Sequence, residues 1–211
     1  MAFNKNQISI VILIIAFAIL TYLVQAISSF SLDLRITHSI QSIDFAAFNG
    51  IMVFFSWAGF PPQSVVLMLL FVGLIYFLGL RWEAAVTLLG GIFGQLLNWL
   101  IKELIHRDRP SGDLVNVVLK LDSYSFPSGH VMFYTEFFGF ICFLAFVLLR
   151  PSWKRNVILI LFGSQVLAVG ISRIYLGAHW ASDVLGAYLL GSLCLIAIIQ
   201  FYRWGKPRYF V

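Results

Sequence analysis

Long apolar segments recur along this chain of 211 residues and constrain its fold more than any other feature. A helix needs about 20 apolar residues to cross the roughly 30 Å hydrocarbon core of a bilayer, because each residue adds about 1.5 Å. Six segments approach that length: residues 8–26, 64–80, 84–101, 130–149, 157–171 and 184–202. We therefore predict an all-α fold, a polytopic membrane bundle of about six transmembrane helices that forms one domain over residues 1–211.

The composition excludes a water-soluble globule. Hydrophobic residues make up 61% of the chain and charged residues only 11%, whereas soluble domains carry roughly 25% charged residues. The net charge of +5 does not indicate nucleic-acid binding, because the basic residues are scattered among the predicted membrane loops. Cys142 and Cys194 both lie inside apolar segments, so neither a disulfide nor a metal cluster is indicated.

Residues 28–62 do not fit the pattern of a single span. Polar residues, among them Asp33 and Asp44, precede an apolar run that Gly59 and Pro61 cut short. We interpret this region as an amphipathic or partly inserted connecting helix outside the main bundle.

Charge placement orients the predicted bundle. If the N-terminus is cytoplasmic, the cytoplasmic side holds one acid, Glu83, and a set of basic residues. These are Lys5, Arg81, Arg150, Lys154, Arg155, Arg203, Lys206 and Arg208. The positive-inside rule therefore predicts that both termini are cytoplasmic. The first segment ends in a sequence that resembles a signal-peptidase site, so cleavage is an alternative; we favour a retained helix, because an even number of crossings places both chain ends in the cytoplasm.

Under this topology the loops at residues 102–127 and 173–183 open on the same, non-cytoplasmic side. The first polar pattern, Lys102 followed seven residues later by Arg109 and then Pro110, lies in one of them. Seven residues make almost two helical turns, so both cations can share one face before Pro110 turns the chain. A basic pair at a membrane edge also occurs as a solvated anchor, so this pattern is weak by itself.

A second pattern, Pro127-Ser128-Gly129-His130, immediately precedes an apolar segment. Ser128 is suited to the N-cap, and Gly129 has no side chain to keep a ligand from the backbone. The first N–H groups of the helix and its positive dipole end would then bind an anion. The same residues could instead form a capped helix with an incidental histidine.

A third pattern joins Ser172-Arg173 to His179 and Asp183. An acid four residues after a histidine can accept a hydrogen bond from one ring nitrogen, which fixes the tautomer and leaves the other nitrogen free to attack. Charged groups at a bilayer edge are costly unless they are paired and used. The alternative is a His–Asp pair with a purely structural role.

Together, the patterns KX6RP, PSGH and SRX5HX3D resemble the signature of the type-2 phosphatidic acid phosphatase (PAP2) superfamily at every defining position. They run from Lys102 to Asp183, and residues 28–62 are the region that the resemblance constrains least. The resemblance implies an acid-phosphatase-like helical fold and a phosphatase that uses neither a metal nor another cofactor.

The same resemblance implies a role for each motif residue. His179 would be the nucleophile that forms a phosphohistidine, with Asp183 orienting it, and His130 would be the general acid for the departing lipid alkoxide. The expected phosphate-binding residues are Lys102, Arg109, Ser128, Gly129 and Arg173.

The apolar segments and the placement of the motifs at the membrane surface predict a substrate that is itself a membrane lipid. Candidates are phosphatidic acid, phosphatidylglycerol phosphate and a polyprenyl pyrophosphate such as undecaprenyl pyrophosphate. The short loop between Pro110 and Pro127 favours simple or promiscuous lipid phosphates. We expect an integral protein of a bacterial cytoplasmic membrane, with its site on the periplasmic or extracellular side; the sequence indicates no oligomeric state.

Two other classes of protein need to be weighed. A non-catalytic protein that binds or transports a lipid phosphate would need the cations but not His179 and Asp183. A vanadium-dependent haloperoxidase would share the motifs but should be soluble, which the hydropathy contradicts.

Several polar residues lie outside the patterns. His106, Arg107 and Asp108 are expected to line or solvate their loop. Glu136 lies within a predicted span, where it either reaches the site or makes an inward-facing hydrogen bond. Trp180 is expected to be an interfacial aromatic residue.

Overall fold

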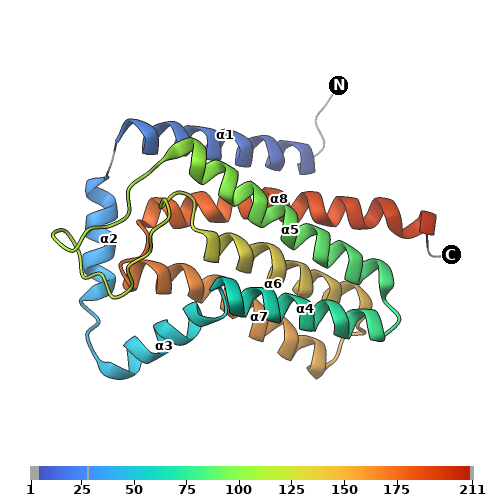
Figure 1. Ribbon diagram of the computed structural model, residues 1–211. Coiled ribbons are helices and arrows are strands. Elements are labelled where there is room, and N and C mark those ends of the chain that lie inside the picture. The colour runs from blue at the N-terminus through green and yellow to red at the C-terminus, as the bar shows by residue number, and fades with distance from the viewer. Residues whose placement is uncertain (1–4, 28, 210–211) are drawn as a thin grey trace.

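The computed structural model describes residues 5–27 and 29–209, and every regular element in that part of the chain is an α-helix. The helices are α1 (Lys5–Ala26), α2 (Ser31–Gln41), α3 (Ala46–Trp57), α4 (Pro61–Phe77), α5 (Arg81–Ile105), α6 (Gly129–Leu148), α7 (Trp153–Tyr175) and α8 (Ala181–Tyr209). The long helices run side by side, as Figure 1 shows. The prediction of an all-α membrane bundle is confirmed. Its extent as one domain stays a prediction, since residues 1–4, 28 and 210–211 lie outside the described residues.

Five of the helices, α1, α5, α6, α7 and α8, are each long and apolar enough to cross a membrane. The predicted span at residues 64–80 corresponds to α4, which together with α3 makes a sixth candidate span. The observed α4 has 17 residues and follows α3 across a break that bends the pair by 60°. Pro61 and Pro62 cause this break, because proline starts a helix well but forces the preceding residue, Phe60, into an extended conformation.

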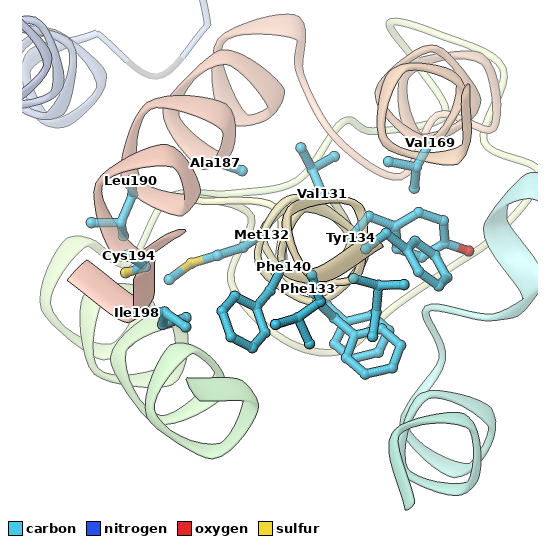
Figure 2. Close-up of a cluster of buried hydrophobic side chains, with 14 of the residues drawn as sticks. Val131, Met132, Phe133, Tyr134, Phe140, Val169, Ala187, Leu190, Cys194 and Ile198 are labelled. Atoms are coloured by element: carbon cyan, nitrogen blue, oxygen red, sulfur yellow. The ribbon is translucent and has the colours of Figure 1, made fainter. Parts of the chain in front are cut away.

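Helix α6 forms the centre of the bundle, with α5, α7 and α8 packed around it. Figure 2 shows its side chains radiating toward these neighbours. Val131, Met132 and Tyr134 are fully buried, and the rings of Phe133 and Phe137 stack with centroids 5.1 Å apart. Because α6 is held on every side, its first residues have a defined position relative to the other helices.

The outer surface of the bundle is apolar. Large hydrophobic side chains are exposed along α1, α4, α5 and α7, and Phe77 is 87% exposed. A soluble monomer rarely presents so much contiguous apolar surface, whereas lipid tails accept it. The chain is therefore an integral membrane protein.

Helix α2 runs across one end of the bundle, beside the loop of residues 106–128, whereas α1 begins and α8 ends at the opposite end (Figure 1). Gln41, the last residue of α2, donates to the carbonyl oxygens of Asn116 (2.7 Å) and Tyr175 (2.9 Å), and accepts from the Asn116 N–H (3.1 Å). The predicted connecting region thus forms two helices, α2 and α3, and α2 fastens the long loop to the bundle.

The turn between α7 and α8 depends on Gly177, which has φ +63°. A Cβ atom at this position would overlap the Asn116 carbonyl oxygen and lie 2.9 Å from the Val117 Cα. We expect Gly177→Ala to lower the midpoint of thermal denaturation in detergent by several degrees, since the left-handed backbone alone costs about 1–2 kcal/mol. The matched control is Gly163→Ala in α7, where nothing lies within 4 Å of the added atom. Equal midpoints for the two variants would contradict this account of the turn.

Candidate active site

Residues from all three sequence patterns meet at the end of the bundle that α2 crosses. Lys102 comes from the last turn of α5, Arg173 from the last turn of α7, and His130 from the first turn of α6. Arg109 and His179 come from the connecting loops. His179 is 1% exposed and Arg173 is fully buried, so the site lies beneath the protein surface.

The imidazole of His179 is held with a defined tautomer. Arg109 Nη1 lies 3.1 Å from His179 Nε2. A guanidinium has only donors, so Nε2 must accept, and the ring proton must lie on Nδ1. Burial lowers the pKa of His179 well below 6.5, and the charges of Arg109, Lys102 and Arg173 lower it further. His179 is thus a neutral base whose unprotonated nitrogen, Nε2, accepts from Arg109.

Asp183 orients His179 through a third residue. The closest approach of the two side chains, His179 Nδ1 to Asp183 Oδ2, is 3.6 Å, which is too long for the direct hydrogen bond that the spacing predicts. The Ser125 hydroxyl donates to Asp183 Oδ2 (2.5 Å) and lies 3.4 Å from His179 Nδ1. The same carboxylate oxygen accepts from the Trp180 N–H (2.9 Å). Ser125 therefore bridges the pair, and no sequence pattern had indicated it.

Arg107 is a second residue whose role the sequence did not reveal. It is 3% exposed rather than solvated, so the expectation that it lines the loop is wrong. Its Nη1 donates to Asp183 Oδ1 (2.6 Å) and Ser182 Oγ (2.7 Å), and its Nη2 donates to Asp33 Oδ2 (2.9 Å). The physical reason is that the buried carboxylate of Asp183 requires a cationic partner. Asp33, from α2, also accepts from the Ser182 N–H (2.8 Å).

Backbone carbonyls hold two of the cations in place. Lys102 Nζ donates to the carbonyl oxygens of Tyr124 and Ser125. Arg109 donates to the carbonyl oxygens of Ser123 (2.5 Å) and Tyr124 (3.1 Å), and burial lowers its pKa to about 10, so that it stays charged at neutral pH. A carbonyl oxygen orients a cation without neutralising it.

Three of the site's cations lack an acidic partner. In the part of the chain that the structure describes, no carboxylate lies within 4 Å of Lys102, Arg109 or Arg173. Positive charge thus accumulates in a buried site, where electrostatic interactions are strong. The site is suited to an anion.

Several buried polar atoms face this region without a partner among the described residues. They are Nε and Nη2 of Arg173, Oγ of Ser128 and Nε2 of His130. Ser128 occupies the N-cap position of α6, as predicted, but its side chain makes no capping bond. Buried polar atoms are almost always hydrogen-bonded, so four such atoms in one site indicate a ligand with several acceptor oxygens.

Gly129 lies at the start of α6, close to a further polar residue. A Cβ atom there would be 3.0 Å from Oδ1 of Asn98, whose Nδ2 donates to the Pro127 carbonyl oxygen (3.2 Å). Asn98 thus supports the turn before α6, another contact without a signal in the sequence.

Glu136 does not reach this site. Its carboxylate lies against α5, where a Cβ atom on Gly94 would overlap it. No group of three or more His, Cys, Asp or Glu side chains suited to a metal occurs within the described ranges.

Known proteins resemble this chain in sequence. A family model described as the PAP2 superfamily matches residues 82–207. Phosphatidylglycerophosphatase B of Bacillus subtilis (strain 168) is 38% identical over 130 residues, which cover 60% of this chain and 62% of that protein. The match thus spans less than two thirds of that relative's length. An undecaprenyl-diphosphatase of Sulfolobus acidocaldarius is 27% identical over 204 residues, 93% of each chain.

The fold also matches a solved structure. It is described as the first transmembrane PAP2 type phosphatidylglycerolphosphate phosphatase from Bacillus subtilis. The TM-score is 0.82 at 30% sequence identity, with 96% of this chain and 98% of that chain covered. The similarity therefore includes α1 to α3, which the family model does not reach.

The network of Asp33, Arg107 and Asp183 leads to a prediction about stability. Removing one member of a buried ion pair leaves a charge uncompensated and typically costs about 3–5 kcal/mol. We expect Asp33→Asn to lower the midpoint of thermal denaturation in detergent by about 5 °C or more. Asp44→Asn, at an exposed position just after α2, is the matched control and should leave the midpoint unchanged. If the two variants have the same midpoint of thermal denaturation, the network does not stabilise the fold.

Proposed function

We propose, from the premise that this chain belongs to the PAP2 superfamily, that it is a membrane phosphatase acting on a lipid phosphate or pyrophosphate through a phosphohistidine. The family model and the solved structure show the membership, and they confirm the resemblance seen in the three sequence patterns. One observation carries the reaction. Buried donors without a partner among the described residues surround a neutral histidine whose Nε2 is free of its proton.

In the first step, His179 Nε2 attacks phosphorus. The N–P bond forms as the bond from phosphorus to the lipid oxygen breaks, and His130, protonated beside the bound phosphate dianion, gives its Nε2 proton to the departing alkoxide and becomes neutral. With a pyrophosphate, the leaving group is the lipid monophosphate. In the second step, water attacks phosphorus, releases inorganic phosphate and restores the neutral imidazole; His130 accepts the proton that water loses.

The cations stabilise the charge that develops during transfer. Phosphoryl transfer spreads negative charge over three equatorial oxygens, so catalysis consists mainly of positioning and electrostatic stabilisation. Arg173 can offer Nε and Nη2 to two oxygens, while the Ser128 hydroxyl and the Gly129 N–H at the start of α6 can donate to the third. Lys102 and Arg109 add positive charge and are already oriented by the loop carbonyls.

The substrate class follows from the apolar exterior and from the relatives. A site at one end of a membrane bundle meets lipid head groups, so a phosphorylated lipid reaches it by diffusion within the bilayer. The Bacillus relative is named for phosphatidylglycerophosphate and the Sulfolobus relative for undecaprenyl diphosphate. Phosphatidic acid, phosphatidylglycerol phosphate and polyprenyl pyrophosphates are therefore the substrates to test.

We place the site on the outer side of a bacterial cytoplasmic membrane, with both termini in the cytoplasm. The N-terminal end of α1 and the C-terminal end of α8 lie at the same end of the bundle, opposite the site. Most of the basic residues of the positive-inside count lie at that end; the side chains of Lys5 and Arg208 are outside the described residues. The bacterial relative supports this membrane.

The decisive experiment is phosphate release by the detergent-purified protein in the presence of EDTA. The panel contains phosphatidic acid, phosphatidylglycerol phosphate, a polyprenyl pyrophosphate and a soluble sugar phosphate. We expect release from at least one lipid, and a loss of about 10⁴-fold or more in His179→Ala, because the nucleophile is removed. A protein that binds all the lipids and hydrolyses none would instead be a lipid-phosphate binding or transport protein.

The lowered pKa of His179 predicts an unusual pH dependence. In His130→Ala, p-nitrophenyl phosphate should still give a burst of nitrophenol, because this leaving group needs no proton. The nucleophile stays neutral as pH falls through 6.5, so we expect the burst rate to be constant between pH 7.5 and 6.0. An ordinary histidine would become protonated, and the rate would fall about fourfold over this range. Such a fall would show that the buried site does not hold His179 neutral.

A further inference from the structure

The bend between α3 and α4 brings a segment outside the three sequence patterns against the candidate active site. We call residues 56–60, which include the end of α3 and the break, the elbow (Figure 1). Two hydrogen bonds anchor the part of α3 that precedes it. The Tyr134 hydroxyl of α6 donates to the Phe55 carbonyl oxygen (2.6 Å), and the Ser172 hydroxyl of α7 donates to the Met52 carbonyl oxygen (2.6 Å). Figure 2 shows Tyr134 extending from α6 in this direction.

The elbow holds the guanidinium of Arg173 on two sides. Arg173 Nη1 donates to the hydroxyl of Ser56, which is 1% exposed. The guanidinium carbon lies 5.6 Å from the centroid of the Phe60 ring, in a cation–π contact. These contacts occupy one nitrogen and one face of the group, and Nε and Nη2 stay free for phosphate oxygens.

The elbow also holds the imidazole of His130. The rings of Phe60 and His130 meet edge to face, with centroids 4.6 Å apart. A Cβ atom on Gly59 would overlap His130 Cδ2 and lie 2.8 Å from Cγ. Because His130 Nε2 has no hydrogen-bond partner among the described residues, packing against the elbow sets the direction of this ring.

We propose that Gly59 and Phe60 are positioning residues for the general acid, and that Ser56 and Phe60 position the phosphate clamp. One ring, that of Phe60, contacts both His130 and Arg173, so the elbow sets the proton donor relative to the bound phosphate. A general acid misplaced by even 1 Å loses much of its effect. This inference rests on the proposed function and adds to it a segment that the family model at residues 82–207 does not cover.

The test uses the leaving group as its readout. Gly59→Ala keeps every reacting group but displaces His130, so release of phosphate from a lipid should fall about 10²-fold or more, the usual contribution of a general acid. The burst rate with p-nitrophenyl phosphate should change less than about threefold, because that leaving group departs without a proton. Gly50→Ala, in the preceding helix α3 and with nothing within 4 Å of the added atom, should behave like the wild type.

A double variant distinguishes positioning from general damage. If Gly59 acts through His130, then Gly59→Ala combined with His130→Ala should be no slower on the lipid than His130→Ala alone. Equal losses on both substrates, or a further tenfold loss in the double variant, would overturn the proposal. If Gly59→Ala does not fold, Phe60→Leu takes its place. Because Phe60 also contacts Arg173, this variant is judged by lipid turnover alone, which should fall in Phe60→Leu and be restored in Phe60→Tyr, which keeps the ring; wild-type turnover in Phe60→Leu would overturn the proposal.

The failure of this inference can be told from failure of the proposed function. If the wild-type protein releases phosphate from no lipid and gives no burst with p-nitrophenyl phosphate, the proposed phosphatase activity is wrong, and the elbow has no general acid to position. If wild type and His130→Ala behave as proposed while Gly59→Ala hydrolyses the lipid at the wild-type rate, only the role of the elbow is overturned.

Discussion

The rest of the site depends on how the protein compensates the buried charge of Asp183. An unpaired carboxylate is strongly disfavoured in a low-dielectric interior, and Asp183 is fully buried at the start of α8. Arg107 supplies the opposite charge and also binds Asp33, so one guanidinium joins α2, the long loop and α8. The other carboxylate oxygen accepts from Ser125, which orients His179. A contact that stabilises the fold therefore also sets the geometry of the proposed nucleophile.

Unlike Asp183, the remaining cations of the site have no partner of opposite charge among the described residues. Lys102 and Arg109 are oriented by carbonyl oxygens, and Arg173 by a hydroxyl and an aromatic ring, so their charges are not cancelled by carboxylates. This arrangement is unfavourable for the protein alone, but the cations need little reorganisation when a phosphate dianion arrives. Burial, reinforced by these cations, lowers the pKa of His179 and keeps the proposed nucleophile neutral.

The site combines a tightly packed helix bundle with a position at the membrane surface. Helix α6 is buried among α5, α7 and α8, and its packing defines where His130 begins the helix. The outer faces of the surrounding helices are apolar and lie in lipid, whereas the polar end carries the loops. Head groups lie at that level in a bilayer, so a buried pocket can still receive the phosphate of a lipid.

The sequence by itself determined the properties that depend on near neighbours along the chain. Helix positions follow from runs of apolar residues, and the motif residues from short spacings, so the long helices and the gathering of Lys102, Arg109, His130, Arg173 and His179 were predictable. The bend before α4 was only partly visible, in its glycine and prolines. Only the tertiary structure decided the partners contributed by Asp33, Arg107, Ser125 and Phe60. These contacts join residues far apart in the chain, and no spacing encodes which buried charge or ring will meet which.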